Sequence, residues 1–270
     1  MKQIELHPSG LNGFFECSYR WYRDNIFMPI RRVGVAAHLG TAIHKAAEVY
    51  YNESIKEAKW SAARDDYKGL AIDTFRERIK DDEPNDIKEV DINSIEKIIG
   101  DNCLSYIKNS EKLNSGKLPV EVEKKYVVEV NSPVIKNISG TLDIVGDDYI
   151  ADIKTMRKSK NPKAYVLQQG VYAFLRQKFG EEVKDLRIHR IVLTNNSIDN
   201  VSIIDSLDNP FTPIDAVIEK SKSYLELVIK TVNEFNKTGN ELLFRGNPES
   251  LLCNPKYCAY YGECKFKKGF

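Results

Sequence analysis

Residues 140–155 read G-T-L-D-I-V-G-D-D-Y-I-A-D-I-K-T and predict two β-strands joined by a tight G-D-D turn. Successive side chains of a strand point to opposite faces, so Asp152 and Lys154 project together while Ile153 turns toward the core. Strand pairing across the turn can bring Asp143 close to Asp152. The stretch therefore predicts a hairpin that gathers two carboxylates and one ammonium group.

The hydrophobic pattern changes from helical to strand-like near Pro119. Before that point, apolar residues at helical spacing predict helices over 39–59, 62–80 and 92–108. After it, alternation predicts an antiparallel meander, and further elements follow as a helix over 161–179, a strand over 186–194 and a long helix over 213–237. This order predicts an α/β protein with a helical insertion before its sheet.

Composition restricts the class of protein. The chain has 270 residues, with 40 Lys and Arg against 39 Asp and Glu, so affinity for a polyanion must come from local patches. The first ten residues lack the apolar core of a signal peptide, and no apolar run approaches the length of a membrane span. We expect a soluble cytoplasmic protein without a membrane partner.

The hairpin residues suggest metal chemistry. Asp143 and Asp152 would repel each other unless a cation lies between them, and hard oxygen ligands suit Mg²⁺ or Mn²⁺. Lys154 could orient a water molecule and offset charge on a phosphate. The alternative for the D-x-K pattern is an ion pair on an exposed strand. His44 is a possible additional ligand, although a lone histidine is more often a partly buried structural residue.

The cysteines suggest a second metal centre. Cys17 lies near the N-terminus, whereas Cys253, Cys258 and Cys264 lie within the last eighteen residues. Four thiolates can hold zinc or an iron-sulfur cluster, and the ligand count leaves both open. Either metal would join the two ends of the chain. Cys103 lies in a run with helical spacing and is expected to be a buried structural thiol.

Five motifs follow one another in an order that resembles the RecB-like branch of the PD-(D/E)XK nucleases. They are G-x-x-x-H ending at His44, G-T-L-D, D-I-K, Q-x-x-x-Y from Gln168 to Tyr172, and the cysteine tail paired with an early cysteine. Members with an iron-sulfur cluster include CRISPR-associated adaptation exonucleases, AddB-type nuclease domains and phage exonucleases. The resemblance covers both ends and the middle of the chain, leaving mainly residues 60–118 unmatched.

The resemblance implies a restriction-endonuclease-like core, with a central mixed sheet flanked by helices and a cysteine-ligated cluster joining both terminal regions. It implies one domain over 1–270, comprising N-terminal helices (1–59), a helical insertion (60–118), the nuclease core (119–240) and the cysteine tail (241–270).

The resemblance also implies a role for each motif residue. His44, Asp143, Asp152 and the carbonyl of Ile153 would bind the metal, with Lys154 as the catalytic lysine. Gln168 and Tyr172 would position the DNA strand and the active site. Cys17, Cys253, Cys258 and Cys264 would bind a [4Fe–4S] cluster, which we favour over zinc.

A basic run beside the predicted metal site comprises Arg157, Lys158, Lys160 and Lys163. Such runs are usually solvated faces, but here Arg157 and Lys158 are candidates for contact with a DNA backbone. The expected activity is that of a metal-dependent DNA exonuclease acting on single-stranded or frayed ends, in recombination, repair or phage DNA metabolism. A phage enzyme would act in the host cytoplasm.

Two alternatives stay open. One is a CRISPR adaptation nuclease that trims spacers, and the other is a non-catalytic DNA-binding or scaffold protein with a nuclease fold. The sequence contains no G-x-x-x-x-G-K-[ST] phosphate loop, so a helicase or recombination partner would have to supply any unwinding.

Overall fold

The computed structural model describes residues 3–27, 29–30, 33–82, 84, 86–156, 165–192, 201–204 and 213–267. Its strands are β1 (Ile4–Leu6), β2 (Glu121–Glu129), β3 (Ile135–Val145), β4 (Tyr149–Met156), β5 (Asp185–Val192) and β6 (Val201–Ile204). Its helices are α1 (Leu11–Glu16), α2 (Ser18–Tyr22), α3 (Val35–Glu57), α4 (Asp65–Asp81), α5 (Ile92–Leu113), α6 (Val166–Gln177) and α7 (Ile214–Thr238). Short helical turns are η1 (Pro8–Gly10), η2 (Arg23–Phe27), η3 (Ile87–Glu89) and η5 (Glu241–Leu243).

The strands form one mixed sheet in the order β1-β3-β4-β5-β6, with β2 also paired to β3. Strands β2, β3 and β4 pair antiparallel in sequence order, which confirms the predicted meander. Strand β5 lies parallel to β4, and β1 lies parallel to β3. A parallel neighbour needs a crossover, and α6 lies on the connection from β4 to β5.

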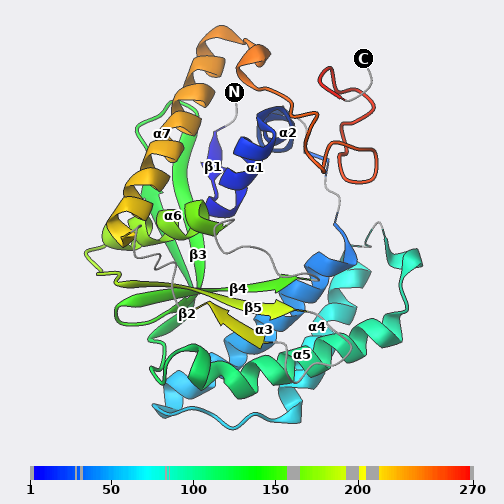
Figure 1. The fold of residues 1–270 in the computed structure, drawn as a ribbon, viewed down its shortest axis with the longest axis vertical. Helices are drawn as coiled ribbons and strands as arrows, with labels where there is room; N and C mark the ends of the chain where they lie inside the picture. Colours follow the sequence, from blue (N-terminus) through cyan, green and yellow to red (C-terminus); the bar gives the residue numbers. More distant parts are fainter. Residues whose placement is uncertain are drawn as a thin grey trace.

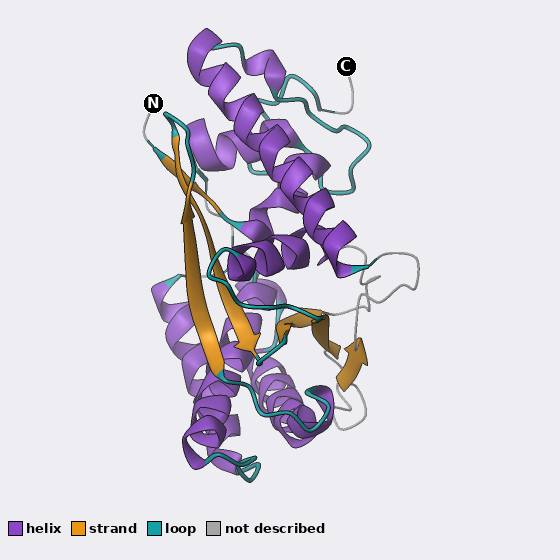
Figure 2. Cartoon of the chain, turned by 90° about the vertical axis from the view of Figure 1, so that its left-hand side faces the viewer, coloured by secondary structure: helices purple, strands orange, loops and turns teal. Residues whose placement is uncertain are grey.

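Helices cover both faces of the sheet (Figures 1 and 2). Side chains of β4 alternate between two apolar cores, because Ile150 packs with the core shared by α1, α2, α6 and α7, whereas Ile153 packs with the core of α3, α4 and α5. Helices α4 and α5 lie within residues 60–118, the range predicted to form a helical insertion. No helix in the described residues is long and apolar enough to cross a membrane.

Two glycines allow helices to approach the sheet closely. A Cβ atom on Gly40 of α3 would lie 2.8 Å from Oγ1 of Thr155 on β4. A Cβ atom on Gly140 of β3 would lie 2.9 Å from the ring of Tyr172 and 3.0 Å from Leu175, both on α6. Real Cβ contacts are almost never under 3.0 Å. The glycines of G-x-x-x-H and G-T-L-D therefore set the distance between these helices and the strands.

A buried polar chain connects the helical insertion to the sheet. Tyr106 bonds His189 on β5 at 2.9 Å and Tyr51 on α3 at 2.9 Å. Asn114 donates to Tyr51 at 3.1 Å and accepts from Tyr149 on β4 at 3.0 Å. Burial, which penalises the charged imidazole, and to a smaller extent the charge of Arg187 together lower the pKa of His189 from 6.5 to about 3.

We expect His189 to make stability depend on pH. The folded chain keeps this imidazole neutral down to about pH 3, whereas the unfolded chain protonates it below about pH 6.5. Stability is therefore lost as pH falls through that window, by up to about 1.4 kcal/mol per pH unit. Urea unfolding at pH 7 and at pH 5 measures this loss. Between these two pH values, the free energy of unfolding of the wild-type protein should fall by about 2 kcal/mol more than that of a His189→Gln variant. Parallel losses in the two proteins would contradict this.

We expect Gly140→Ala to lower the free energy of unfolding by about 1–3 kcal/mol, because the added methyl group overlaps the Tyr172 ring. Denaturant unfolding measures the loss. Combining the change with Tyr172→Leu should cost less than the two single changes added together. Gly69→Ala is the matched control, since a Cβ there meets nothing within 4 Å and should stabilise α4 by about 0.5–1 kcal/mol. An additive double variant would refute the contact.

Candidate active site and cysteine centre

The site begins where β3 and β4 separate. These strands pair at only two positions, Ile144 with Ala151 and Val145 with Ile150. One step further along that register, Asp143 faces Asp152, but no ladder bond forms there. Instead, Oδ2 of Asp143 accepts the backbone N–H of Ile153 at 2.6 Å. A side chain thus satisfies a peptide group that the partner strand leaves unpaired.

The carbonyl of the same residue faces α3. Nε2 of His44 lies 2.9 Å from the oxygen of Ile153, and Nδ1 lies 3.7 Å from Oδ2 of Asp143. Neighbouring ligands of an octahedral ion with bonds of about 2.1 Å lie about 3 Å apart. The 2.9 Å separation between the His44 nitrogen and the Ile153 oxygen is compatible with both atoms serving as neighbouring ligands of one such ion.

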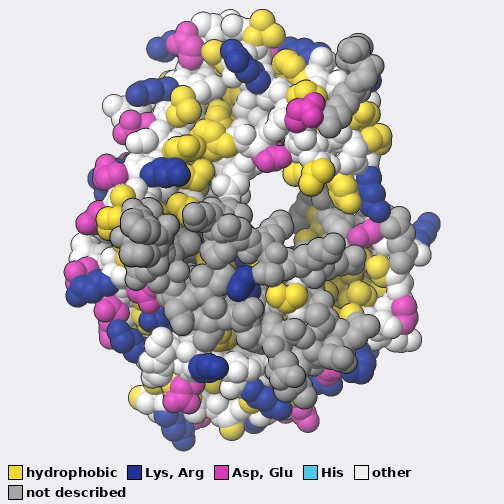
Figure 3. All heavy atoms as spheres, in the orientation of Figure 1, with side chains coloured by type: hydrophobic (Ala, Val, Ile, Leu, Met, Phe, Trp, Pro, Cys, Tyr) yellow, Lys and Arg dark blue, Asp and Glu magenta, His cyan; other side chains and the backbone are white. Residues whose placement is uncertain are grey.

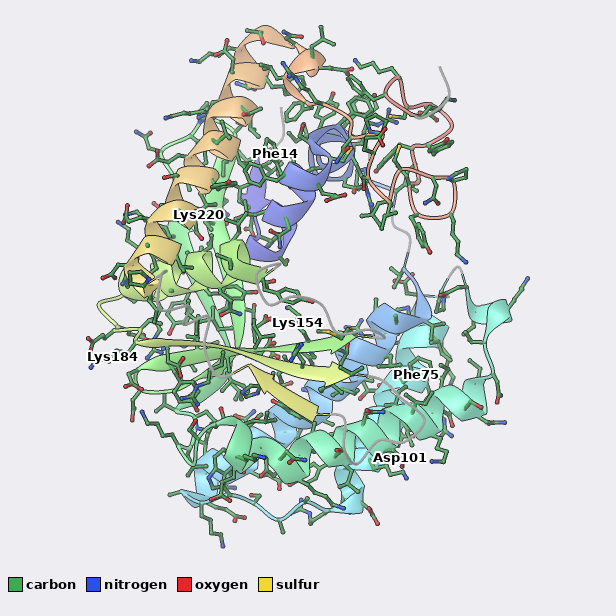
Figure 4. The ribbon with its side chains drawn as sticks, in the orientation of Figure 1. Phe14, Phe75, Asp101, Lys154, Lys184 and Lys220 are labelled. Atoms are coloured by element: carbon green, nitrogen blue, oxygen red, sulfur yellow. The ribbon has the colours of Figure 1, made fainter. Side chains whose placement is uncertain are left out.

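Asp152 is buried and held from two sides. Its carboxylate lies 2.7 Å from Nζ of Lys154 and accepts from Nε2 of Gln168 at 3.1 Å. Burial raises the pKa of Asp152 to about 6, while the charge of Lys154 opposes that rise. Burial also disfavours the charge on Lys154, but attraction to Asp152 and Asp143 outweighs it and raises the pKa of the ammonium group. Figure 4 places Lys154 on β4.

Gln168 and Tyr172 lie one turn apart on α6, as predicted. Nε2 of Gln168 also donates to the Tyr172 hydroxyl at 2.9 Å. Hydrogen bonds therefore connect Tyr172 through Gln168 to the carboxylate of Asp152. Both are buried, with 4% and 7% of their surface exposed. Their polar atoms are therefore placed to orient Asp152. Arg157 and Lys158 lie outside the described residues.

Glu123 is a site residue that sequence reasoning missed. It lies on β2 opposite Asp143, between the paired positions Val122 and Lys124, with a left-handed backbone at φ 50°. Donor atoms of His44, Glu123 and Asp143 all lie within 4.8 Å of one another. Burial and the charge of Asp143 raise the pKa of Glu123 to about 7. The alternating pattern places Glu123 on the exposed face of β2, and no sequence signal marks its left-handed backbone.

An open groove of about 630 Å³ lies between α3 and β4, and Asp143 and Asp152 are not among its lining residues. His44, Glu123, Ile153 and Lys154 are among its lining residues. Glu48, one turn after His44, also lies there and accepts from Lys45 at 2.8 Å. The groove therefore offers oxygen and nitrogen ligands together with an ammonium group, which is what an incoming phosphate and a divalent cation require.

A second cavity lies at the other end of the molecule. Its volume is about 270 Å³, and Cys17, Cys253, Cys258 and Cys264 all line it. Burial raises the pKa of Cys258 and of Cys264, and neighbouring cysteines reinforce the shift. Cys103 does not line this cavity and is a buried thiol, as predicted. Its Sγ lies 3.7 Å from the carbonyl oxygen of Tyr67. The residues fit a thiolate-bound metal, and sulfur donors suit zinc and iron-sulfur clusters alike.

Helix α2 and the cysteine tail lie side by side at this cavity (Figure 1). The backbone N–H of Arg245 donates to Oγ of Ser18 at 2.7 Å, and Asn247 donates to the carbonyl of Glu16 at 2.9 Å. Arg23 of η2 forms a 3.0 Å ion pair with Glu263. The cysteine tail is therefore fastened beside Cys17 by hydrogen bonds of its own.

Comparison with known proteins identifies the family. The family model of the PD-(D/E)XK nuclease superfamily matches residues 5–265. The comparison with curated proteins finds no match. Among solved structures, the chain resembles a "Putative exonuclease" from Eubacterium rectale with 13% identity and a TM-score of 0.60, over 98% of this chain and 90% of that one. A second structure, of SSO0001, has 18% identity and a TM-score of 0.32, over 72% of this chain and 82% of that one.

The first of these likenesses extends to the fold alone, because the identity is low. It agrees with the mixed sheet flanked by helices, which is a restriction-endonuclease-like fold. The family match extends over nearly the whole chain, including the hairpin with Asp143, Asp152 and Lys154. This chain belongs to the PD-(D/E)XK nuclease superfamily.

Proposed function

We propose that this nuclease is a metal-dependent DNA exonuclease of the RecB-like branch, acting on single-stranded or frayed ends. The observation that carries the proposal is the convergence of Asp143, Asp152, Lys154 and the His44–Ile153 pair beside one groove. A scaffold protein without catalytic function would have no need to keep a buried carboxylate and a buried ammonium group facing a possible phosphate site, because burying charge is costly.

Each side chain has a distinct role in this proposal. Asp143, Asp152, His44 and the Ile153 carbonyl would hold Mg²⁺ or Mn²⁺. When bound, the cation polarises the phosphate and lowers the pKa of a water ligand. Lys154 orients the attacking water and offsets charge that develops on the phosphate. Gln168 keeps Asp152 in place through its 3.1 Å hydrogen bond.

Two observations support a substrate with a free end. The surface shows an opening beside the half of the molecule that contains α1, α2 and the tail (Figure 3). The structural neighbour from Eubacterium rectale is named "Putative exonuclease". Arg157 and Lys158 remain proposed DNA contacts. Trimming of CRISPR spacers would use the same chemistry on a different DNA end.

For the cysteine centre we propose a [4Fe–4S] cluster with a structural role. Four cysteines from both ends of the chain line one cavity, and Tyr260, which is buried, lines it as well. Such a cluster would close a loop of 253 − 17 = 236 positions. By analogy with a covalent cross-link, closure could stabilise the fold by roughly 5 kcal/mol at most.

We expect Asp152→Asn to abolish cleavage and Lys154→Ala to slow it by about 10²-fold or more, because each removes a group that acts on the reacting phosphate. Cleavage of end-labelled single-stranded DNA with Mg²⁺ or Mn²⁺ measures the rate, and fluorescence anisotropy measures binding. Binding should largely persist in both variants. Asp147→Asn, in the turn of the same hairpin, is the control and should cleave normally.

The same assay tests whether cleavage requires a free DNA end. Linear single strands should be degraded, whereas closed circular single strands of the same sequence should persist. Efficient cleavage of the circles would refute the exonuclease proposal but not the nuclease. Near wild-type turnover by Asp152→Asn would refute the assignment of the site.

We expect anaerobically purified protein to be brown and to contain iron and acid-labile sulfide. Cys17→Ser should remove the colour and lower the thermal midpoint together, since one ligand and the closed loop are lost at once. Absorbance spectroscopy, metal analysis and thermal unfolding measure these effects. Cys103→Ser is the control, because a hydroxyl can still donate to the Tyr67 carbonyl. A colourless anaerobic protein with stoichiometric zinc would refute the iron proposal.

A further inference from the structure

Helix α6 carries a third buried polar side chain on the face that holds Gln168 and Tyr172. The Q-x-x-x-Y motif continues as Q-x-x-x-Y-x-x-x-R and ends at Arg176, so the three side chains follow one another at intervals of four residues. Arg176 is only 3% exposed. Burying a guanidinium group is costly unless it is paired, so the partners of Arg176 indicate what it does.

The partners of Arg176 are the turn of the β3–β4 hairpin and one carboxylate. Nη2 donates to the carbonyl oxygen of Asp147 at 2.7 Å, and Nη1 donates to that of Tyr149 at 2.8 Å. Nε donates to Glu181 at 2.9 Å, and Glu181 also accepts from the Tyr126 hydroxyl of β2 at 2.7 Å. The guanidinium group therefore joins α6 to the turn, to the start of β4 and, through Glu181, to β2.

The hairpin itself has few hydrogen bonds between its strands. Strands β3 and β4 pair at two positions, and the turn adds a 2.9 Å bond from the N–H of Gly146 to the carbonyl of Tyr149. Asp143 and Asp152 lie one step beyond the last pair, where no ladder bond fixes the distance between them. Contacts from outside the hairpin must therefore contribute to the position of β4.

Two of these contacts come from α6 and reach β4 at different points. Gln168 donates to the carboxylate of Asp152 at 3.1 Å, and Arg176 donates to the backbone of Tyr149. Eight residues of α-helix span about 12 Å, and three residues of β-strand span about 10 Å. The two spans match, so α6 holds the segment of β4 that leads from the turn to Asp152 at both of its ends.

We propose that Arg176 is a positioning residue for the nuclease reaction, which fixes β4 against α6 and thereby holds Asp152 and Lys154 beside the groove. This inference rests on the proposed function. Arg176 acts through the backbone of β4 and does not touch the reacting atoms. A displacement of about 1 Å caused far from the chemistry can cost about 10²-fold in rate. Lysine carries the same charge, but only the planar guanidinium fork donates in three fixed directions.

Arg176→Lys tests the proposal, because it keeps the positive charge beside Glu181 and removes the fork. Turnover of end-labelled single-stranded DNA should fall by about 10- to 100-fold. The KM for DNA should stay within about twofold, because a residue that is 3% exposed makes no contact with DNA that the change could remove. Glu181→Gln should cost less turnover, since the bonds from Arg176 to the two carbonyls remain.

Hydrogen exchange of the Ile153 N–H tests the same role without any need for activity. This amide donates to Asp143 at 2.6 Å, across the point where β3 and β4 separate. In Arg176→Lys its exchange rate, measured by NMR relative to the amides of β5, should rise at least tenfold. An unchanged relative rate at Ile153 would overturn the proposal.

Two variants are matched controls, and both should keep wild-type turnover and relative exchange at Ile153. Lys178→Gln removes an exposed basic residue two positions further along the chain. Phe75→Leu lowers stability in the core of α3, α4 and α5, away from the hairpin. Circular dichroism and thermal unfolding check that each variant is folded at the assay temperature.

Turnover by Arg176→Lys within twofold of wild type would overturn the positioning role. An equal loss in Phe75→Leu would do so as well, because it would trace the effect to lost stability. Wild-type protein that cleaves no DNA, combined with faster exchange at Ile153 in Arg176→Lys, would refute the proposed function and support the role of Arg176 in holding the hairpin.

Discussion

The backbone N–H and carbonyl of Ile153 connect the elements that form the candidate site. The N–H of Ile153 donates to Asp143 on β3, and its carbonyl oxygen bonds His44 on α3. Its side chain is buried in the core of α3, α4 and α5, and its backbone is aligned with His189 on β5. One residue therefore ties two strands and a helix to fixed positions. In the proposed function this carbonyl is a metal ligand, and because it is already held in place it would need little reorganisation to bind the cation.

The separation of β3 from β4 is the structural condition for this arrangement. Had the ladder continued past Ile144 and Ala151, the N–H of Ile153 would have faced a strand and not a carboxylate. Burial of Asp152 and Lys154 side by side then requires mutual compensation, because an unpaired buried charge is strongly destabilising. In the proposed function, Asp152 would bind the cation and Lys154 would act on the phosphate, so the ion pair that compensates both charges in the free protein would be exchanged for contacts with the metal and the substrate.

Local periodicity made much of this fold predictable. Alternation placed Asp152 and Lys154 on one face with Ile153 in the core, and the spacing of Gln168 and Tyr172 placed them on one face of α6. Glu123 was not predictable, because its left-handed backbone departs from the strand pattern around it. The hydrogen bond between Tyr106 and His189 could not be predicted either, since the two residues are 83 positions apart in the sequence. Interactions between distant residues leave no periodic signal in a single sequence.

Aromatic packing holds the elements around the four cysteines in place without any metal. Rings of Phe14, Trp21, Tyr22, Phe235 and Phe244 contact one another, with Tyr22 and Phe244 stacked at 4.6 Å. Aromatic pairs of this kind each contribute about 0.5–1.5 kcal/mol beyond their buried area. They join α1 and α2 to α7 and η5, just before the tail begins. Loss of the proposed cluster should therefore leave the tail held only by its contacts such as Asn247 with Glu16 and Glu263 with Arg23, and should not disturb the sheet, because the aromatic contacts keep α1 and α2 in place. In the proposed function, the metal at the cysteines would therefore fix the position of the tail, whereas the metal in the groove between α3 and β4 would supply chemistry on a scaffold that is already formed.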